Sequence, residues 1–187
     1  MATKIYIVEG HNPVNPNAGS EGNGFREQDL VYTIGQMTAA SLKSYGFDVR
    51  LSRPSPTTQL GTSNTTSLQA RVNDANSWGA DYFISLHTNA SDVTSASGSE
   101  AFVYRRDSDA EYLAENILTQ LNYATGLQNR GVMVRPGLYV LKKTRMPATL
   151  VELGFITNPV DAELMAYSPG LFAAGVSNGV LAYFGML

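Results

Sequence analysis

Three residues able to bind a metal or transfer a proton each follow a short apolar stretch of the chain. They are His11 after residues 5–8, His87 after residues 82–86, and Glu152 after residues 148–151. Apolar, β-prone runs of this length are typical of buried strands. His11 and His87 are the chain's two histidines, and both occupy this position. We therefore expect the ends of three strands to build one site.

A parallel α/β sheet would bring these residues together, because its binding crevice lies outside the carboxyl ends of the strands. Glu27 opens the helix expected after the first loop, which should begin on the same edge of the sheet. His11, Glu27 and His87 then make the ligand set of two imidazoles and one carboxylate that is typical of catalytic zinc sites. Glu152 is assigned as the general base beside the metal.

Simpler explanations exist for some of these residues. A single histidine at a strand end is usually an ordinary loop residue. Glu27 could be an acid favoured by the dipole in the first turn of a helix, and Glu9, Glu21 or Asp29 could replace it as a ligand. Glu152 is harder to explain without a function, because a carboxylate that continues an apolar strand is costly to bury without a partner or a metal.

The elements that must position these groups alternate along the chain. Strands are expected over residues 4–8, 47–51, 82–90, 100–105, 138–141 and 148–151. Helices are expected from about residue 26 to Gly46, through Leu68, Val72 and Ala75 to Gly79, and from the capping box Ser108-Asp109-Ala110-Glu111, Asn158-Pro159 and Ser168-Pro169. Loops join them at residues 10–24, 53–67 and 91–99.

This order of elements predicts an α/β fold: a mostly parallel, twisted sheet of about six strands, flanked by helices on both faces, in a single domain. The strand at 148–151 is expected to end in Glu152 and to break at Gly154, and the two late strands leave room for an antiparallel member. Arg71, on a polar helix face, is expected to be structural.

Composition excludes several classes of function. The 187 residues are 43% hydrophobic and 16% charged, with a net charge of −3, so nucleic acid and anionic membranes are not expected as partners. The absence of cysteine rules out disulfides and thiolate metal sites. No apolar run approaches the roughly 20 residues of a membrane span, and the first one is too short for the core of a signal peptide.

Several segments resemble a known family. Val8-Glu9-Gly10-His11 and Gly24-Phe25-Arg26-Glu27 are similar to the strand-His and Gly-x-x-Glu segments of the zinc-dependent N-acetylmuramoyl-L-alanine amidases of the amidase-3 type. Residues 85–90 look like their second histidine segment, and residues 129–132, 138–141 and 146–155 like their late segments, in the family's order. One segment departs from the pattern: the family usually has Asp-Pro-Gly-His-Gly-Gly where this chain has Glu9-Gly10-His11-Asn12-Pro13.

The resemblance implies that His11, Glu27 and His87 bind one Zn²⁺ per chain and that Glu152 is the catalytic glutamate. The implied reaction is hydrolysis of the amide between the lactyl group of N-acetylmuramic acid and L-alanine in peptidoglycan. Two alternatives are a zinc peptidase or carboxypeptidase acting on wall peptides, and a non-catalytic peptidoglycan-binding module.

Residues 1–187 are expected to form a single catalytic amidase domain without a separate wall-binding domain, and to act as a monomer. With no signal peptide in this chain, the protein is expected to reach the wall after lysis, as a phage or mother-cell enzyme, or to be an excised domain of a secreted protein.

Overall fold

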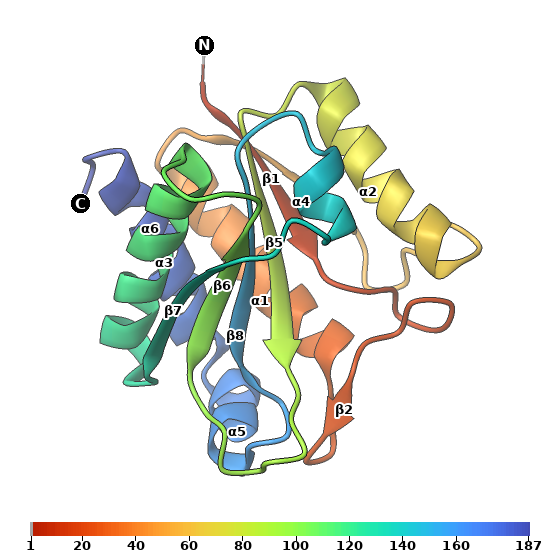
Figure 1. Cartoon of the computed structure of the whole chain (residues 1–187), viewed down its shortest axis with the longest axis vertical. Helices are drawn as coiled ribbons and strands as arrows, with labels where there is room; N and C mark the ends of the chain where they lie inside the picture. Colours follow the sequence, from red (N-terminus) through yellow and green to blue (C-terminus); the bar gives the residue numbers. More distant parts are fainter. Residues whose placement is uncertain (1) are drawn as a thin grey trace.

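Six strands form the central sheet in the computed structural model, which describes residues 2–187 (Figure 1). Their spatial order is β4-β1-β5-β8-β6-β7. The first four run parallel, whereas β6 runs antiparallel to β8 and parallel to β7. The strands are β1 (Lys4–Glu9), β4 (Asp48–Leu51), β5 (Tyr82–Asn89), β6 (Ser99–Val103), β7 (Asn129–Val134) and β8 (Ala148–Phe155).

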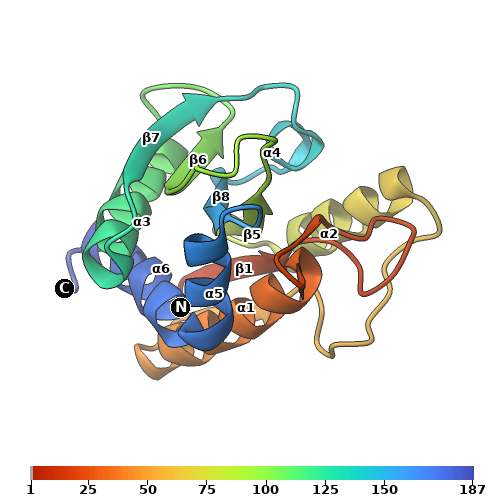
Figure 2. The same ribbon diagram turned by 90° about the horizontal axis from the view of Figure 1, so that it is seen from below.

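Helices cover both faces of this sheet, as the sequence predicts. Figure 2 shows α1 and α6 on one side of the strands and α2 and α4 on the other. Alternate residues of β1 explain the two layers: Ile5 and Ile7 pack into the core under α1, α3 and α6, whereas Tyr6 and Val8 pack under α2 and α4. The helices are α1 (Glu27–Ser44), α2 (Asn64–Trp78), α3 (Asp109–Thr125), α4 (Tyr139–Lys143), α5 (Pro159–Tyr167) and α6 (Pro169–Tyr183).

The helices α2 and α4 cover only part of their face of the sheet. They lie over its upper part in Figure 1, where the strands present apolar side chains such as Phe83 and Leu150. Further along the same strands, alternation brings His87 and Glu152 to this face. These two residues are register partners between β5 and β8, and Glu152 is in turn opposite Glu100 of β6. A polar row therefore crosses the part of the face that no helix covers.

The first long loop contains a small two-stranded ribbon, β2 (Glu21–Gly22) and β3 (Phe25–Arg26), directly before α1. Within residues 2–187, no helix has both the length and the apolar character required to cross a membrane.

One predicted strand is wrong, and one strand of the central sheet was missed. Residues 138–141 were expected to be extended, but α4 begins at Tyr139, with Leu138 as its N-cap. A four-residue apolar run fits a buried helical turn as well as a strand. The missed strand, β7, lies at the edge of the sheet, and the mostly polar, exposed residues Asn129 and Arg130 at its start conceal it in the sequence.

One strand end was also misplaced. β8 continues through Glu152 to Phe155, whereas β5 ends at Asn89, one residue before its expected end, so His87 and Glu152 both lie within strands. Gly154 does not break β8. A side chain there would lie 3.2 Å from the Asp161 carboxylate, which accepts a hydrogen bond from the N–H of Phe155 at 2.9 Å.

Helix starts were predicted more accurately. Asn158 caps α5, and Pro159 and Pro169 open α5 and α6. The expected capping box at Ser108 is only half formed: the Ser108 hydroxyl accepts the N–H of Glu111 at 3.3 Å, but the Glu111 carboxylate accepts from the N–H of Asp107 at 2.7 Å. The end of the loop expected over residues 53–67 is helical, because α2 already begins at Asn64.

Close packing of α3 against α6 gives a test of the fold. A Cβ at Gly179 would overlap the backbone of Ile117, so Gly179→Ala should lower the free energy of unfolding by about 1–3 kcal/mol. Urea unfolding followed by circular dichroism measures the change. Gly137→Ala is the control, because nothing lies within 4 Å of a Cβ there. Equal stability of the two variants would contradict the packing.

Candidate metal centre and active site

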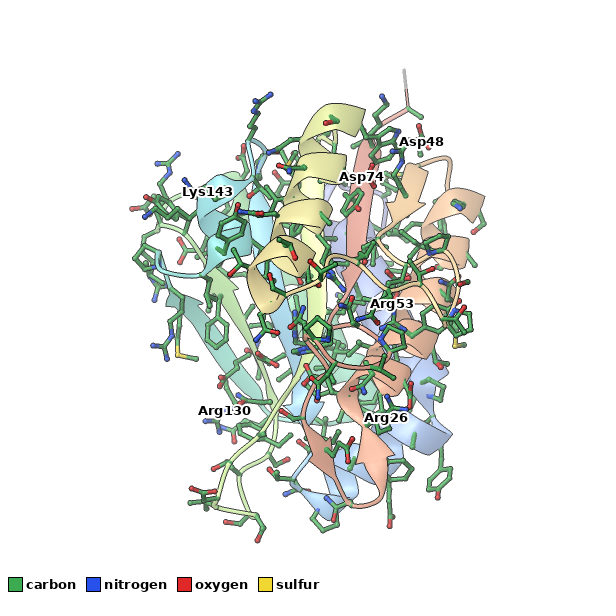
Figure 3. All side chains as sticks on the ribbon, turned by 90° about the vertical axis from the view of Figure 1, so that its right-hand side faces the viewer. Arg26, Asp48, Arg53, Asp74, Arg130 and Lys143 are labelled. Carbon is green, nitrogen blue, oxygen red and sulfur yellow. The ribbon has the colours of Figure 1, made fainter. Side chains whose placement is uncertain are left out.

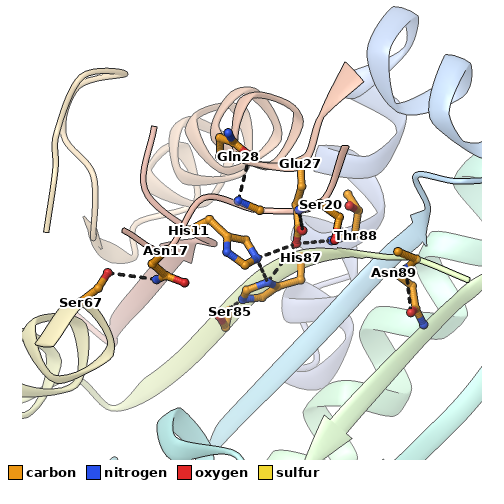
Figure 4. Close-up of polar contacts among 12 residues, drawn as sticks. His11, Asn17, Ser20, Glu27, Gln28, Ser67, Ser85, His87, Thr88 and Asn89 are labelled. Atoms are coloured by element: carbon orange, nitrogen blue, oxygen red, sulfur yellow. Dashed lines mark hydrogen bonds and ion pairs between the residues drawn. The ribbon is translucent and has the colours of Figure 1, made fainter. Parts of the chain in front are cut away.

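Three ligand atoms from distant parts of the chain converge beside the uncovered part of the sheet (Figure 4). His11 Nε2 and His87 Nδ1 each lie 3.1 Å from Glu27 Oε1, and the two nitrogens are 3.2 Å apart. A tetrahedral ion with bonds of about 2.0–2.1 Å holds its ligands about 3.3 Å from one another. The three atoms therefore have the spacing that one small metal ion requires, and the cluster could bind a metal.

His11 is placed by its backbone. It lies two residues beyond β1 with a φ of 68°, a left-handed conformation that is uncommon for a residue with a side chain. Its carbonyl oxygen accepts hydrogen bonds from two buried guanidinium groups, Nη2 of Arg71 and Nη1 of Arg53, the latter at 3.3 Å. Two cations from α2 and the loop after β4 thus hold His11 in place.

Glu27 is the first residue of α1 and is buried. Its Oε1 also accepts the N–H of Thr88 at 3.0 Å, and its Oε2 accepts the N–H of Ser20 at 2.9 Å. Burial raises the pKa of this carboxyl, but hydrogen bonds with His11 and His87 outweigh that effect and hold it well below its usual range. Glu27 is therefore an anion, as a metal ligand must be.

His87 presents Nδ1 to the cluster and Nε2 to Ser85. Nε2 lies 3.1 Å from the Ser85 hydroxyl, which is buried two residues earlier on the same face of β5. With Nδ1 facing the ligands, Nε2 carries the proton and donates it to Ser85. Burial, above all, lowers the pKa of His87 and so favours the neutral ring that a metal needs. The period-two spacing of Ser85 and His87 was a signal in the sequence that was not used.

Glu152 lies next to the cluster without belonging to it. It is the register partner of His87 on β8, and its Oε2 is buried with no hydrogen-bond partner among the described residues. Burial chiefly, and then the carboxylates of Glu27 and Glu100, raises its pKa to about 8. Glu100 itself accepts hydrogen bonds from Asn89 at 2.7 Å and Arg130 at 2.8 Å. The unpartnered oxygen of Glu152 is thus available to exchange a proton.

The structure excludes the other carboxylates that the sequence left open as ligands. Glu9 is buried, but it accepts hydrogen bonds from Ser52 at 2.9 Å and from the N–H of Arg53 at 3.1 Å, away from the cluster. Glu21 and Asp29 are exposed and face Arg26 at 3.8 Å and 3.5 Å. Glu27 is therefore the carboxylate that the fold brings to the two histidines.

Arg71 has the structural role that was expected, but not the expected environment. It is buried rather than on a polar surface, and it contacts the loop that carries His11.

A mainly apolar cavity of about 240 Å³ adjoins the cluster on the side of α2 and α4. Ser85, His87 and Leu150 line it from the sheet, and Leu68 of α2 and Val140 of α4 line it from the helices. A cavity of this kind beside potential metal ligands can hold an apolar part of a ligand while the metal ligands contact its polar part.

The mixed sheet and the histidine–glutamate–histidine cluster, which could bind a metal ion, together define an α/β protein with a candidate metal site at one end of its parallel strands. A family model described as N-acetylmuramoyl-L-alanine amidase (Amidase_3) matches residues 5–182, and the chain belongs to this family.

Individual relatives agree with this membership. The chain is 34% identical over 184 residues to N-acetylmuramoyl-L-alanine amidase LytC of Bacillus subtilis, covering 96% of this chain and 35% of LytC. It is also 34% identical over 192 residues to N-acetylmuramoyl-L-alanine amidase CwlM of Bacillus licheniformis, covering 98% and 69%. The chain thus spans about a third of LytC and two thirds of CwlM.

Solved structures place the similarity in a catalytic domain. The catalytic domain of CwlV, an N-acetylmuramoyl-L-alanine amidase of Bacillus (Paenibacillus) polymyxa var. colistinus, superposes with a TM-score of 0.85 at 25% identity, covering 99% of both chains.

Removal of the Ser85 hydroxyl should weaken metal binding. In Ser85→Ala the Nε2–H of His87 loses its acceptor, so the ring is less firmly held and affinity for Zn²⁺ should fall about 10-fold or more. Competition with a chromogenic chelator measures this affinity. Ser177→Ala, which removes a buried hydroxyl in α6, is the control and should bind Zn²⁺ like the parent. Unchanged affinity in Ser85→Ala would show that Ser85 does not position the ring.

The metal-free protein should lose stability as the pH rises, in part through Glu152. Its pKa in the folded state, about 8, lies above the ordinary value of 4.5, so between these values the folded state binds more protons than the unfolded one. Stability must then fall with rising pH. With a chelator present, the decline in melting temperature up to about pH 8 should be smaller for Glu152→Gln than for the parent. Parallel curves for the two proteins would contradict a buried, protonated Glu152.

Proposed function

We propose that this chain is a zinc-dependent N-acetylmuramoyl-L-alanine amidase that hydrolyses the amide bond between the lactyl group of N-acetylmuramic acid and L-alanine in peptidoglycan. The convergence of His11, Glu27 and His87 within 3.2 Å of one another, in a chain of the amidase family, carries this proposal. Residues 1–187 are proposed to contain the catalytic domain.

The metal ligands are assigned as His11 Nε2, Glu27 Oε1 and His87 Nδ1, one Zn²⁺ per chain. Two imidazoles and a carboxylate are a donor set of catalytic zinc sites, in which a fourth position stays open. Zinc at such a site supplies Lewis acidity toward a carbonyl oxygen and lowers the pKa of water. The buried arginines at the His11 carbonyl and the hydroxyl of Ser85 hold the two rings in orientation before substrate arrives.

Glu152 is assigned as the general base. Its carboxylate accepts a proton from the water that attacks the lactyl carbonyl, and then returns this proton to the nitrogen of the departing L-alanine. A pKa of about 8 leaves the metal-free side chain protonated at neutral pH. With a divalent cation bound by His11, Glu27 and His87, the nearby positive charge would favour the ionised form of Glu152, which would then be able to accept a proton.

The surroundings of the cluster suit a polymeric substrate. The polar row lies on the part of the sheet that α2 and α4 leave uncovered, and the 240 Å³ cavity adjoins it. All four functional groups come from one chain, which supports action as a monomer on the cell wall.

Mass spectrometry of digested sacculi tests the proposal. Digestion should release stem peptides with a new N-terminal L-alanine, and a chelator should stop it. Release of free amino acids without that terminus would identify a zinc peptidase. Sedimentation with sacculi that survives chelation, without any released product, would identify a binding module.

Substitution of the base separates metal binding from turnover. Glu152→Gln keeps the shape of the side chain and leaves the three ligands intact, so zinc content should stay at one per chain. Turnover of purified muramoyl peptide should fall at least 100-fold, since a general base contributes about 10²–10⁴-fold. Zinc content comes from atomic absorption and turnover from liberated amino groups. A metal-replete variant with parental turnover would remove Glu152 from this role.

A further inference from the structure

Positive charge gathers on one surface of this acidic chain. Arg105, Arg135, Lys142, Lys143 and Arg145 are exposed, and within residues 2–187 none of them forms an ion pair; we call these five residues the basic surface. The other exposed arginines, Arg50, Arg106 and Arg130, have acidic partners, such as Asp74 for Arg50 at 3.0 Å. In Figure 3, Lys143 lies on the side of α4, apart from Arg26 and Arg53. Among the described residues, the exposed arginines without an acidic partner thus all belong to this surface.

Part of the basic surface borders a cavity of about 390 Å³. Arg105 contributes from the connection between β6 and α3, and Lys142 and Arg145 contribute from α4 and the connection to β8. Asp109 is the one carboxylate in its lining, against these three cations. Tyr104 and Met146 add apolar walls. The cavity therefore combines a net positive charge with enough space for part of a peptide.

This basic cavity is a neighbour of the metal cluster. The short helix α4 separates it from the 240 Å³ cavity: Tyr139 and Val140 line the cavity at the cluster, and Leu141 and Lys142 line the basic one. Glu152 and Ala148, which also lines the basic cavity, are four residues apart on β8, or about 13 Å. Leu150 between them is buried against Val140 and Leu141 of α4, so a peptide that reaches both places must pass over α4 and not along the strand.

We propose that the basic cavity binds the carboxylates of the peptidoglycan stem peptide whose first amide bond lies at the metal cluster. This inference rests on the proposed function. Stem peptides continue from L-alanine through residues with free carboxylates, and arginine and lysine pair with carboxylates by charge-assisted hydrogen bonds. The stem peptide is covalently attached at the bond that lies at the metal cluster, whereas a phosphodiester polymer of the wall is not. The stem peptide is therefore the favoured ligand of a cavity beside α4.

Kinetics on soluble muramoyl peptides test the proposal in the zinc-loaded protein. Lys142→Ala/Arg145→Ala should raise KM about 5-fold for peptides with free carboxylates, a size in keeping with two solvent-exposed charge contacts, and leave kcat unchanged. For the same peptides with amidated carboxylates, KM should not change. Lys4→Ala/Lys43→Ala, which also removes two cations, is the control and should behave like the parent. An equal rise in KM for free and amidated peptides would overturn the proposal.

A binding measurement separates this inference from the proposed function. Calorimetry with chelated protein and the free-carboxylate peptide should show weaker binding by Lys142→Ala/Arg145→Ala than by the parent, whether or not the parent turns over substrate. Equal binding by both proteins would overturn the inference and leave the amidase activity intact. Sedimentation of Glu152→Gln with sacculi should be unchanged after acid extraction of phosphodiester polymers. Loss of sedimentation would overturn the proposal in favour of such a polymer.

Discussion

The arrangement of the candidate metal site depends on a buried carboxylate that lies between two imidazoles. Glu27 is buried, and its charge is compensated by hydrogen bonds from the backbone N–H groups of Ser20 and Thr88 and by its contacts with His11 and His87. A carboxylate without these partners would be too costly to bury. Because the partners come from the first loop and from β5, the chain must be fully folded before the three ligand atoms can meet. A metal ion would then bind to a site that already has the required spacing.

The cluster also requires residues behind it that hold the two histidines in position. His11 is held through its backbone by Arg71 and Arg53, and Arg53 is fixed in turn by Glu9, whose carboxylate accepts its N–H. Glu9 stands where the family usually has proline, directly before the glycine of the first histidine segment. Its buried hydrogen bonds to Ser52 and Gln36 show how this chain stabilises the altered loop. The position of His11 is thus held by contacts that run from Glu9 through Arg53 to the His11 carbonyl.

Much of this arrangement was predictable from the sequence. The apolar runs that end in polar residues predicted β1, β5 and β8. Because parallel strands have their carboxyl ends at the same edge of a sheet, His11 and His87 were correctly expected to lie at one edge. Sequence reasoning from the residues alone left Glu9, Glu21, Asp29 and Glu27 as possible ligands, because spacing along a loop does not determine where the chain turns. It also missed β7, an exposed edge strand without alternation, and assigned α4 to a strand because four apolar residues have no clear period. Ser85 and Arg71 act through burial, which a single sequence does not reveal.

The incomplete cover of the sheet by α2 and α4 has a consequence for how a large polymer can be processed. A site enclosed on all sides admits only free chain ends, which must be threaded into it. Here no helix crosses the lower part of this sheet face in Figure 1, where β5, β8 and β6 carry the polar row. A strand fixed at both ends in a network would therefore not have to be threaded past a helix to reach the cluster.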